Sequence, residues 1–268
     1  MNDKLDRKPQ LEVVGLIPAA GRATRVGPLP CSKELFPVGF RVMSEEYNAG
    51  PKVVCHYLLE KMRLAGVTTA YIVLREGKWD IPAYLGDGNM LGMHLAYLIM
   101  GLPYGVPFTI DQAYPFAQNA LVAFGFPDIL IDPLDVFVQL LSRQALNDAD
   151  VVLGMFPADR PHKVDMLELD DNGKIKKILI KPRQTSLQFT WAVAVWTPVF
   201  THFLHKYLIT IKDSAAMQQE LFMGEVFQAA INEGLAVEAV RVSSKPFLDI
   251  GTGDDLMRAV RRCIKEQD

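Results

Sequence analysis

Apolar residues occur in two patterns along the first half of the chain. Residues 11–17, 69–74 and 120–126 are continuous apolar runs, which are typical of strands buried on both faces of a parallel sheet. Residues 51–64 instead repeat apolar side chains at helical spacing, and Gly66 is placed to end this helix. Strand, helix and strand joined by short connections predict a parallel sheet wound with helices.

In the second half, hairpin signals replace the parallel winding. A strand is predicted over residues 151–156, and residues 163–170 and 174–180 alternate on either side of an Asn-Gly turn, which predicts a β-hairpin. The remaining predicted elements are strands over 189–196 and 235–242 and helices over 134–145, 197–208, 217–232 and 254–264. We therefore predict an α/β fold in one domain, residues 1–268, with a mostly parallel, Rossmann-like mixed sheet flanked by helices and an antiparallel hairpin region.

The composition narrows the class of function. A net charge of −3 over 268 residues is unlike the positive charge of proteins that bind nucleic acid. The three cysteines are widely spaced and match neither a disulfide framework nor a zinc ligand set. The first ten residues are polar and charged, unlike a secretory signal. The most apolar span, residues 90–108, is interrupted by His94 and two prolines, unlike a membrane helix. We therefore expect a cytoplasmic protein that contacts neither nucleic acid nor a membrane.

The loop after the first strand carries the candidate chemistry. It is rich in small residues, contains Arg22 and Arg25, and is followed by Lys33. Small side chains let backbone N–H groups approach an oxyanion, while Arg25 and Lys33 would supply the cations that phosphoryl oxygens require. The spacing matches neither a P-loop nor a dinucleotide-binding fingerprint, so a different phosphate site is predicted.

This region carries a family resemblance. The nucleotide-binding signature of the sugar-1-phosphate nucleotidylyltransferases resembles two segments here, Leu16-Ile17-Pro18-Ala19-Ala20-Gly21-Arg22-Ala23-Thr24-Arg25 and Ser32-Lys33-Glu34-Leu35-Phe36-Pro37-Val38. Later motifs of the same family resemble residues 85–88, 127–128, 181–182 and 247–253, so the resemblance extends over most of the chain. It implies a GT-A-like nucleotidyltransferase fold, with a nucleotide-binding half over about residues 11–130 and an acceptor-substrate half over about residues 150–255.

The resemblance also implies roles for individual residues. Arg25, Lys33 and Lys181 are the expected catalytic residues, with Lys181 at the phosphate of the acceptor. Two aspartates at strand ends, Asp128 and Asp249, would hold Mg²⁺. The expected nucleotide contacts are Ala19, Ala20, Gly21, Arg22, Thr24, Met100 and Thr109, and the expected acceptor contacts are Asp165, Ile180 and Trp191.

Several positions differ from the family pattern. Ser32 stands where relatives have proline, and Met100 where many have a glutamine that reads the base. A methionine cannot donate and accept hydrogen bonds as an amide does, so backbone groups or other side chains must read the base. On the acceptor side, Asp165 replaces a glycine, Ile180 a glutamate and Trp191 a threonine. These three also fit as ordinary strand residues, with the tryptophan in the core.

The pattern favours a Mg²⁺-dependent enzyme that transfers a nucleoside monophosphate from a nucleoside triphosphate, with dTTP or UTP favoured, to a sugar 1-phosphate or similar phosphorylated acceptor, releasing pyrophosphate. The alternative is a non-catalytic relative that binds a nucleotide or nucleotide sugar for regulation. Asp148-Ala149-Asp150 matches the Asp-x-Asp motif of glycosyltransferases, but it precedes a strand instead of following one. Asp132 and Asp135 are assigned to the start of a helix. Assembly into a homo-oligomer is left open.

Overall fold

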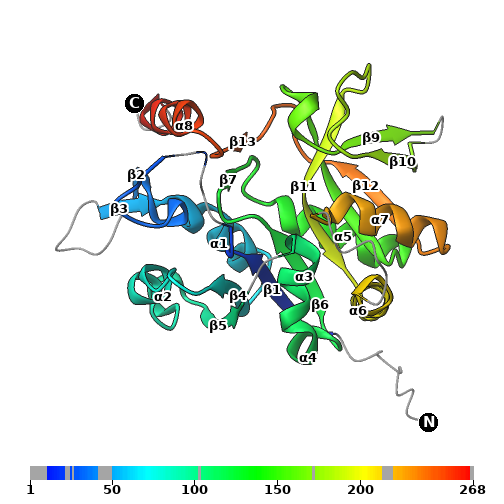
Figure 1. The fold of residues 1–268 in the computed structure, drawn as a ribbon, viewed down its shortest axis with the longest axis horizontal. Coiled ribbons are helices and arrows are strands. Elements are labelled where there is room, and N and C mark those ends of the chain that lie inside the picture. The colour runs from blue at the N-terminus through cyan, green and yellow to red at the C-terminus, as the bar shows by residue number, and fades with distance from the viewer. Residues whose placement is uncertain are drawn as a thin grey trace, which may run out of the picture.

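A nine-stranded mixed sheet forms the centre of the computed structural model (Figure 1). The structure describes residues 11–21, 25, 27–41, 50–101, 104–170, 173–212 and 220–265. The strands of this sheet are β1 (Val13–Pro18), β4 (Thr69–Arg75), β5 (His94–Met100), β6 (Leu121–Gly125), β8 (Val151–Pro157), β9 (Met166–Leu169), β10 (Ile175–Leu179), β11 (Phe189–Trp196) and β12 (Val237–Arg241).

The other elements surround this sheet. Two small ribbons are formed by β2 (Pro37–Arg41) with β3 (Gly50–Val53) and by β7 (Ile129–Leu130) with β13 (Leu248–Asp249). The α-helices are α1 (Val54–Leu64), α2 (Asp80–Leu85), α3 (Val106–Ile110), α4 (Tyr114–Ala117), α5 (Val136–Asn147), α6 (Pro198–Lys212), α7 (Met223–Asn232) and α8 (Gly253–Lys265). Short 3-10 turns are η1 (Lys33–Leu35), η2 (Asn89–Leu91), η3 (Asp111–Ala113) and η4 (Pro161–Lys163).

The sheet is mostly parallel. β6, β1, β4 and β5 are parallel neighbours in that order. β11 runs antiparallel to β6 on one side and to β8 on the other, and β12 is parallel to β8. Of the seven strands from β5 to β12 across the sheet, β11 alone therefore runs in the opposite direction. The β9–β10 hairpin joins the sheet where Met166 pairs with Thr190 of β11. The predicted fold class, including the antiparallel hairpin region, is confirmed.

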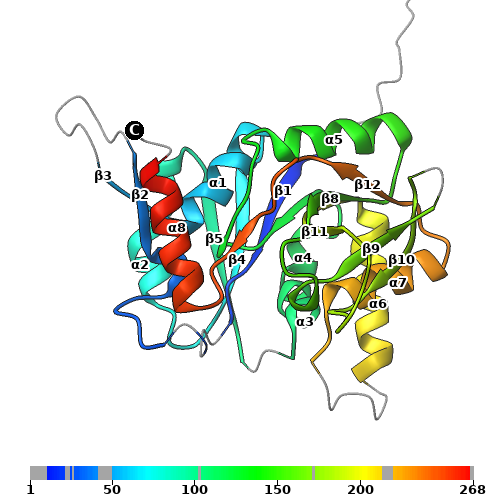
Figure 2. The same ribbon diagram turned by 90° about the horizontal axis from the view of Figure 1, so that it is seen from above.

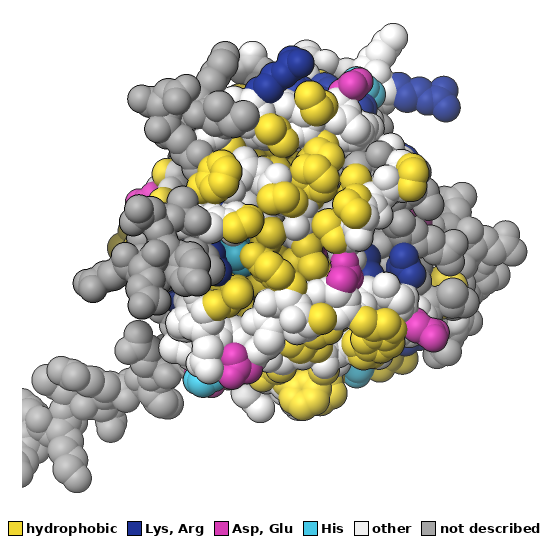
Figure 3. All heavy atoms as spheres, turned by 90° about the vertical axis from the view of Figure 1, so that its left-hand side faces the viewer, with side chains coloured by type: hydrophobic (Ala, Val, Ile, Leu, Met, Phe, Trp, Pro, Cys, Tyr) yellow, Lys and Arg dark blue, Asp and Glu magenta, His cyan; other side chains and the backbone are white. Residues whose placement is uncertain are grey.

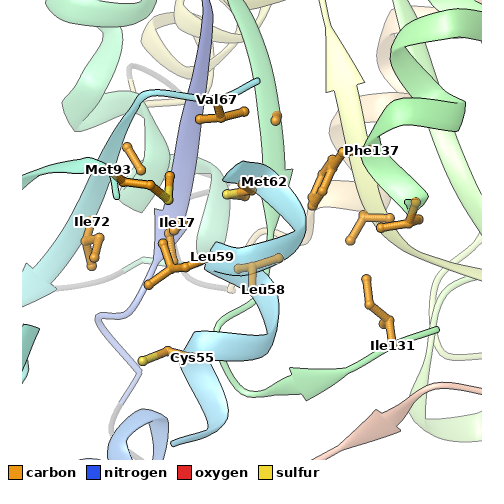
Figure 4. Packing of buried hydrophobic residues seen from close by; sticks show 14 of the residues in the cluster. Ile17, Cys55, Leu58, Leu59, Met62, Val67, Ile72, Met93, Ile131 and Phe137 are labelled. Carbon is orange, nitrogen blue, oxygen red and sulfur yellow. The ribbon is translucent and has the colours of Figure 1, made fainter. Parts of the chain in front are cut away.

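Helices cover both faces of the sheet, as Figure 2 shows. Side chains alternate along β1, so Val14 and Leu16 belong to the core cluster on one face and Ile17 to the cluster on the other. On the face of Ile17, α1 and α5 supply Met62 and Phe137 to the same cluster, part of which appears in Figure 4. α3, α6 and α7 pack on the opposite face. Burial on both faces explains why these strands have continuous apolar sequences.

Two predicted helix starts are wrong. The helix expected over 51–64 begins at Val54, because residues 50–53 form β3, and Gly66 ends it with a φ of +86° as expected. The helix expected over 134–145 begins at Val136 with Asp135 at its N-cap position, and the Asp132 carboxylate instead pairs with Arg262 of α8. An ion pair between distant segments leaves no pattern in the local sequence.

Two further predicted elements are shorter or less well capped than expected. The helix predicted over 217–232 begins at Met223; residues 217–219 lie outside the described part of the chain, as do the hairpin turn residues 171–172. Thr197 precedes α6 as expected, but its buried hydroxyl has no hydrogen-bond partner in the described structure, so it does not cap the helix through its side chain.

One side of the molecule exposes many hydrophobic side chains (Figure 3). This is the side of α2, β2 and β5 at the left of Figure 1, and large exposed residues on or beside these elements include Phe40, Trp79, Tyr84 and Ile99. A contiguous apolar face is typical of a protein–protein contact. Among the helices in the described ranges, none combines the length and the hydrophobicity that crossing a membrane would require.

Candidate active site

The carboxyl ends of β1, β6 and β8 open towards a cavity of about 460 Å³. Ligands of doubly wound sheets bind outside such strand ends. The lining includes these residues predicted from the sequence: Arg25, Lys33, Asp128, Asp165, Lys181, Trp191 and Asp249. They come from segments more than two hundred residues apart, which the fold brings together.

Asp128 and Asp249 are held side by side by the β7–β13 ribbon. Asp249 pairs with Ile129, the residue after Asp128, and the Ile250 N–H donates to the Asp128 carbonyl at 3.0 Å. The ammonium of Lys33 pairs with the Asp128 carboxylate, and the two side chains are only 13% and 17% exposed. Two carboxylates and one lysine therefore form one compact charged group at this end of the cavity.

The charged side chains in this group shift one another's pKa values. Burial raises the pKa of Asp249 to about 6, the Asp128 carboxylate adds to this rise, and Lys33 and Arg25 oppose it. Burial by itself would lower the pKa of Lys33, but the attraction of Asp128 raises that pKa above its ordinary value. The lysine therefore stays protonated, while Asp249 is a carboxylate that a further cation would stabilise.

Asp165 occupies the other end of the cavity, at the N-terminus of α7. Its carboxylate accepts backbone N–H groups of Gly224 and Lys181, and a Cβ at Gly224 would lie 2.5 Å from its Oδ2. Only glycine leaves room for this approach. Burial nevertheless raises the pKa of Asp165 to about 6, against the attraction of Lys181, and Oδ1 has no hydrogen-bond partner in the described structure.

Replacement of Asp165 by asparagine is expected to change how stability depends on pH. A carboxyl whose pKa rises on folding binds protons more tightly in the folded state, so wild-type stability falls as pH rises from about 4 to above 6. Asparagine does not ionise, so the variant does not lose this stability. As the pH rises through this range, the free energy of unfolding of wild type should therefore fall by up to about 3 kcal/mol relative to that of the variant.

Urea unfolding of Asp165→Asn and wild type at about pH 4 and pH 7.5 measures this shift. Glu168→Gln is the matched control, because Glu168 lies on the same hairpin in a surface ion pair with Lys176. A difference between Asp165→Asn and wild type that is the same at both pH values would contradict the prediction.

Lys181 and Trp191 complete the acceptor end. Lys181 has a φ of +39°, unusual for a residue other than glycine, and its ammonium lies 3.7 Å from the centre of the Phe222 ring. Trp191 is 6% exposed and packs edge-on against Phe227 with ring centres 5.0 Å apart, and its indole N–H has no partner in the described structure. The tryptophan is therefore a core residue that reaches the cavity, as its structural interpretation predicts.

Other predicted nucleotide contacts lie outside the cavity lining. Ala19 and Ala20 are buried in the core, and the Ala19 N–H donates to the Val73 carbonyl at 2.8 Å, so it does not point at an anion. Gly21 is exposed, and Arg22 and Thr24 lie outside the described residues. The extension of the β1–β4 pairing uses the Ala19 N–H, so Ala19 could contact a nucleotide only through its other atoms, and the assignment of Ala19 stays a prediction.

Met100 and Thr109 are also displaced from the cavity. Met100 ends β5 as expected, but its side chain is 7% exposed and packs in the core with Phe108. The helix expected near Thr109 begins at Val106, and the Thr109 hydroxyl donates to the Gly105 carbonyl at 3.0 Å. Gly105 and Val106 therefore form the helix start, and Val106 lines the cavity.

Ile180 lies next to the site without lining it. A Cβ at Gly224 would lie 2.7 Å from Ile180 Cδ1, so Ile180 packs beside Asp165 against the first turn of α7. Its side chain therefore supports the Asp165 carboxylate and is not among the atoms that line the cavity.

Sequence reasoning missed a second charged group in the lining. Arg160, His162 and Lys163 come from the loop between β8 and β9. Arg160 donates to Asp255 of α8 at 2.5 Å, and Thr252 donates to the same carboxylate at 2.7 Å. The run of charged residues between two predicted strands could have indicated this group. The partner of Arg160 on α8, Asp255, is however nearly a hundred residues away in the sequence.

The Asp-x-Asp sequence lies away from this cavity. Asp148 ends α5 with a φ of 51°, and the Asp150 carboxylate accepts the Ala236 N–H at 2.9 Å at the beginning of β8. Since the cavity lies beyond the end of β8, this pair sits at the opposite end of the strand and has structural roles.

Comparisons with known proteins agree with this geometry. The nucleotidyl transferase family matches residues 14–266. Among curated proteins, the chain is 21% identical over 257 residues to the low-salt glycan biosynthesis nucleotidyltransferase Agl11 of Haloferax volcanii. It is 25% identical over 254 residues to a glucose-1-phosphate thymidylyltransferase of Streptomyces griseus. Each alignment covers 94% of this chain and 66% of the relative, so the chain spans just under two thirds of their length.

Solved structures share the fold. A Bacillus anthracis protein assigned as a glucose-1-phosphate thymidylyltransferase, in complex with sucrose, superposes with a TM-score of 0.77 at 18% identity, covering 94% of this chain and 95% of that one. UDP-glucose pyrophosphorylase complexed with UDP-glucose gives a TM-score of 0.75 at 17% identity, covering 96% and 100%. From the family match over residues 14–266, the chain belongs to the nucleotidyl transferase family, as its resemblance to the sugar-1-phosphate nucleotidylyltransferases predicts.

Proposed function

We propose that this protein transfers a nucleoside monophosphate from a nucleoside triphosphate to a sugar 1-phosphate or similar phosphorylated acceptor and releases pyrophosphate. The observation that carries the proposal is a single cavity with Lys33, Asp128 and Asp249 at one end and Asp165 and Lys181 at the other. The first end suits the phosphates of a nucleotide and the second suits a phosphorylated acceptor. The nucleotide-binding half then corresponds to about residues 11–130 and the acceptor half to about residues 150–255.

Positioning and charge neutralisation would carry this reaction. A phosphate oxygen of the acceptor attacks the α-phosphorus in line, the bond from that phosphorus to the bridging oxygen breaks, and pyrophosphate leaves with the electron pair. Lys181 would orient the acceptor phosphate, while Arg25 and Lys33 would neutralise the leaving phosphates. No general base is required, because a phosphomonoester is already anionic near neutral pH.

The aspartate pair suits Mg²⁺. In the described residues no group of three or more His, Cys, Asp or Glu side chains could hold a metal, so Asp128 and Asp249 would act as a pair. Mg²⁺ is usually bound in this way, by one or two carboxylates together with phosphates and water. Bound there, Mg²⁺ would neutralise charge on the reacting phosphates. The raised pKa of Asp249 supports the assignment, because a bound cation would stabilise a carboxylate that is buried and also lies beside the Asp128 carboxylate.

The base preference of the proposal, dTTP or UTP, is supported by the names of two relatives, the thymidylyltransferase of Streptomyces griseus and a UTP–glucose-1-phosphate uridylyltransferase of Synechocystis that is 23% identical over 271 residues. Met100 does not line the cavity, so the base would be read by other groups near the start of α3, where Val106 lines the wall. Apolar contact and backbone hydrogen bonds would then replace an amide side chain.

Calorimetry tests the first step of the proposal. UTP, dTTP, CTP, GTP and ATP are titrated with and without Mg²⁺ into wild type and Asp128→Asn. One nucleotide should bind, and its affinity should fall about 10- to 100-fold when Mg²⁺ is omitted or Asp128 is changed, because a charged contact is lost.

Asp135→Asn is the control, since Asp135 is exposed and contacts Gln139 of its own helix. Equal affinity of wild type and Asp128→Asn would refute the metal assignment. If none of the five nucleotides binds wild type, transfer fails at its first step, and the non-catalytic alternative, with a nucleotide sugar as its ligand, becomes the one to test.

A further inference from the structure

Two contacts hold the turn that carries Lys33. On one side, the Ser32 N–H donates to Asp80 Oδ2 at 2.5 Å and the Ser32 hydroxyl donates to Oδ1 at 2.8 Å. On the other side, the Lys78 ammonium donates to the Glu34 carboxylate at 2.5 Å, and both of these side chains are at most 5% exposed. The residues before and after Lys33 are therefore tied to the same connection, between β4 and α2.

This connection is itself anchored. The next residue after Asp80, Ile81, and the last residue of α2, Leu85, are each 2% exposed and belong to the core cluster beneath α1. The Ile81 N–H also donates to the Lys78 carbonyl at 3.3 Å. The packing of α2 in the core therefore fixes the position of the Asp80 carboxylate. Its hydrogen bonds to Ser32 then fix the position of Ser32.

We propose that Asp80 is a positioning residue for Lys33. Its carboxylate fixes the backbone at Ser32, and this determines where the Lys33 ammonium lies beside Asp128. Asp80 and Ser32 are not among the residues that line the cavity, so Asp80 acts through Lys33 and not on a substrate. The effect on turnover rests on the proposed function, whereas the effect on the place of Lys33 does not.

The backbone at Ser32 shows what the contact replaces. The ring of a proline holds φ near −65°. Ser32 has a φ of −55° and a ψ of 139°, which proline also adopts. Proline has no N–H to donate, so a chain with proline here cannot form the contact to Asp80. In this chain two hydrogen bonds restrict a backbone angle that a proline ring would restrict covalently.

This equivalence defines a rescue experiment. Asp80→Ala is expected to lower kcat about 10- to 100-fold, the cost of a small displacement of a catalytic group, with the acceptor KM within about twofold of wild type. Ser32→Pro/Asp80→Ala should recover a large part of the lost kcat, because the ring restores φ without the carboxylate. Asp80→Leu, which has a similar shape and no hydrogen-bond acceptor, replaces Asp80→Ala in both proteins if the alanine variant does not fold.

A second readout does not need activity. The ammonium resonance of Lys33 is observed by NMR of protein labelled with nitrogen-15 lysine and assigned by its absence in Lys33→Arg. It should shift or broaden in Asp80→Ala, return towards the wild-type position in Ser32→Pro/Asp80→Ala, and stay unchanged in the control Asp135→Asn.

A Lys33 resonance that is the same in Asp80→Ala as in wild type would overturn the proposal, whether or not kcat changes. So would a resonance that shifts in Asp80→Ala and stays equally shifted in the proline double variant. If wild type transfers no nucleotide, the proposed function fails, and the resonance still decides whether Asp80 positions Lys33.

Discussion

Lys33→Ala is expected to lower turnover about 100- to 1000-fold, the usual cost of removing one preorganised charge from a transition state. The lysine is mostly buried against Asp128, and the pKa of its ammonium is raised, so it is protonated at neutral pH. Its charge would stabilise the leaving phosphates, which become more negative as the bond to the α-phosphorus breaks. Pyrophosphate release from a sugar 1-phosphate and the nucleotide selected by calorimetry measures the loss.

Lys177→Ala is the matched control for this experiment, because Lys177 is an exposed lysine on β10 that does not line the cavity. Circular dichroism of both variants should match wild type. Wild-type turnover by Lys33→Ala would remove Lys33 from the catalytic group, and an equal loss in Lys177→Ala would show that the effect is not specific to the cavity.

Lys78→Met is expected to lower the free energy of unfolding by about 3–5 kcal/mol, because it leaves the Glu34 carboxylate buried without its partner. The pair is almost fully buried, with exposed fractions of 5% for Lys78 and 3% for Glu34, and the other carboxylate oxygen of Glu34 already has no hydrogen-bond partner in the described structure. Urea unfolding at neutral pH measures the change.

The double variant Glu34→Leu/Lys78→Met separates the lost pair from lost packing. Apolar side chains, including those of Ile17 and Ile81, surround Glu34, so a leucine there removes the unpaired charge and should restore most of the stability. If the double variant is as unstable as Lys78→Met alone, the loss comes from packing and not from the buried charge.

The sequence also predicted chemistry at several positions that the fold brings together. Asp128 and Asp249 were assigned from the family resemblance, as aspartates at strand ends, and the β7–β13 pairing places them next to each other. Arg25, Lys33 and Lys181 likewise meet at one cavity. Their catalytic roles remain proposals. The rule that strand ends of a parallel sheet meet along one edge accounts for the place of Asp128 after β6, but not for Lys181, which follows the antiparallel strand β10.

The base contacts expected at Met100 and Thr109 stay predictions. Met100 and Thr109 were aligned with base contacts, yet both side chains are buried away from the cavity. The cause is the chain between β5 and α3, which starts the helix at Val106, one turn earlier than the alignment supposed. Side chains three or four residues apart lie on the same face of a helix, so a shift of one turn moves Thr109 along the helix axis. The local sequence does not record where this helix starts.

The sequence by itself determined the order and type of the main elements. Continuous apolar runs predicted β1, β4, β6 and β8, because strands buried on both faces need apolar side chains at every position. Polar and apolar side chains that alternate on either side of an Asn-Gly turn predicted the β9–β10 hairpin, and this pattern too is local in the sequence.

Only the tertiary structure decided which distant side chains meet. Asp80 receives Ser32, Arg160 reaches Asp255, and the Asp165 carboxylate lies at the start of α7. These contacts join segments that are about fifty to a hundred residues apart. Periodicity reports which face of an element is buried, but a contact between two elements depends on how they pack, and that is set by the whole core.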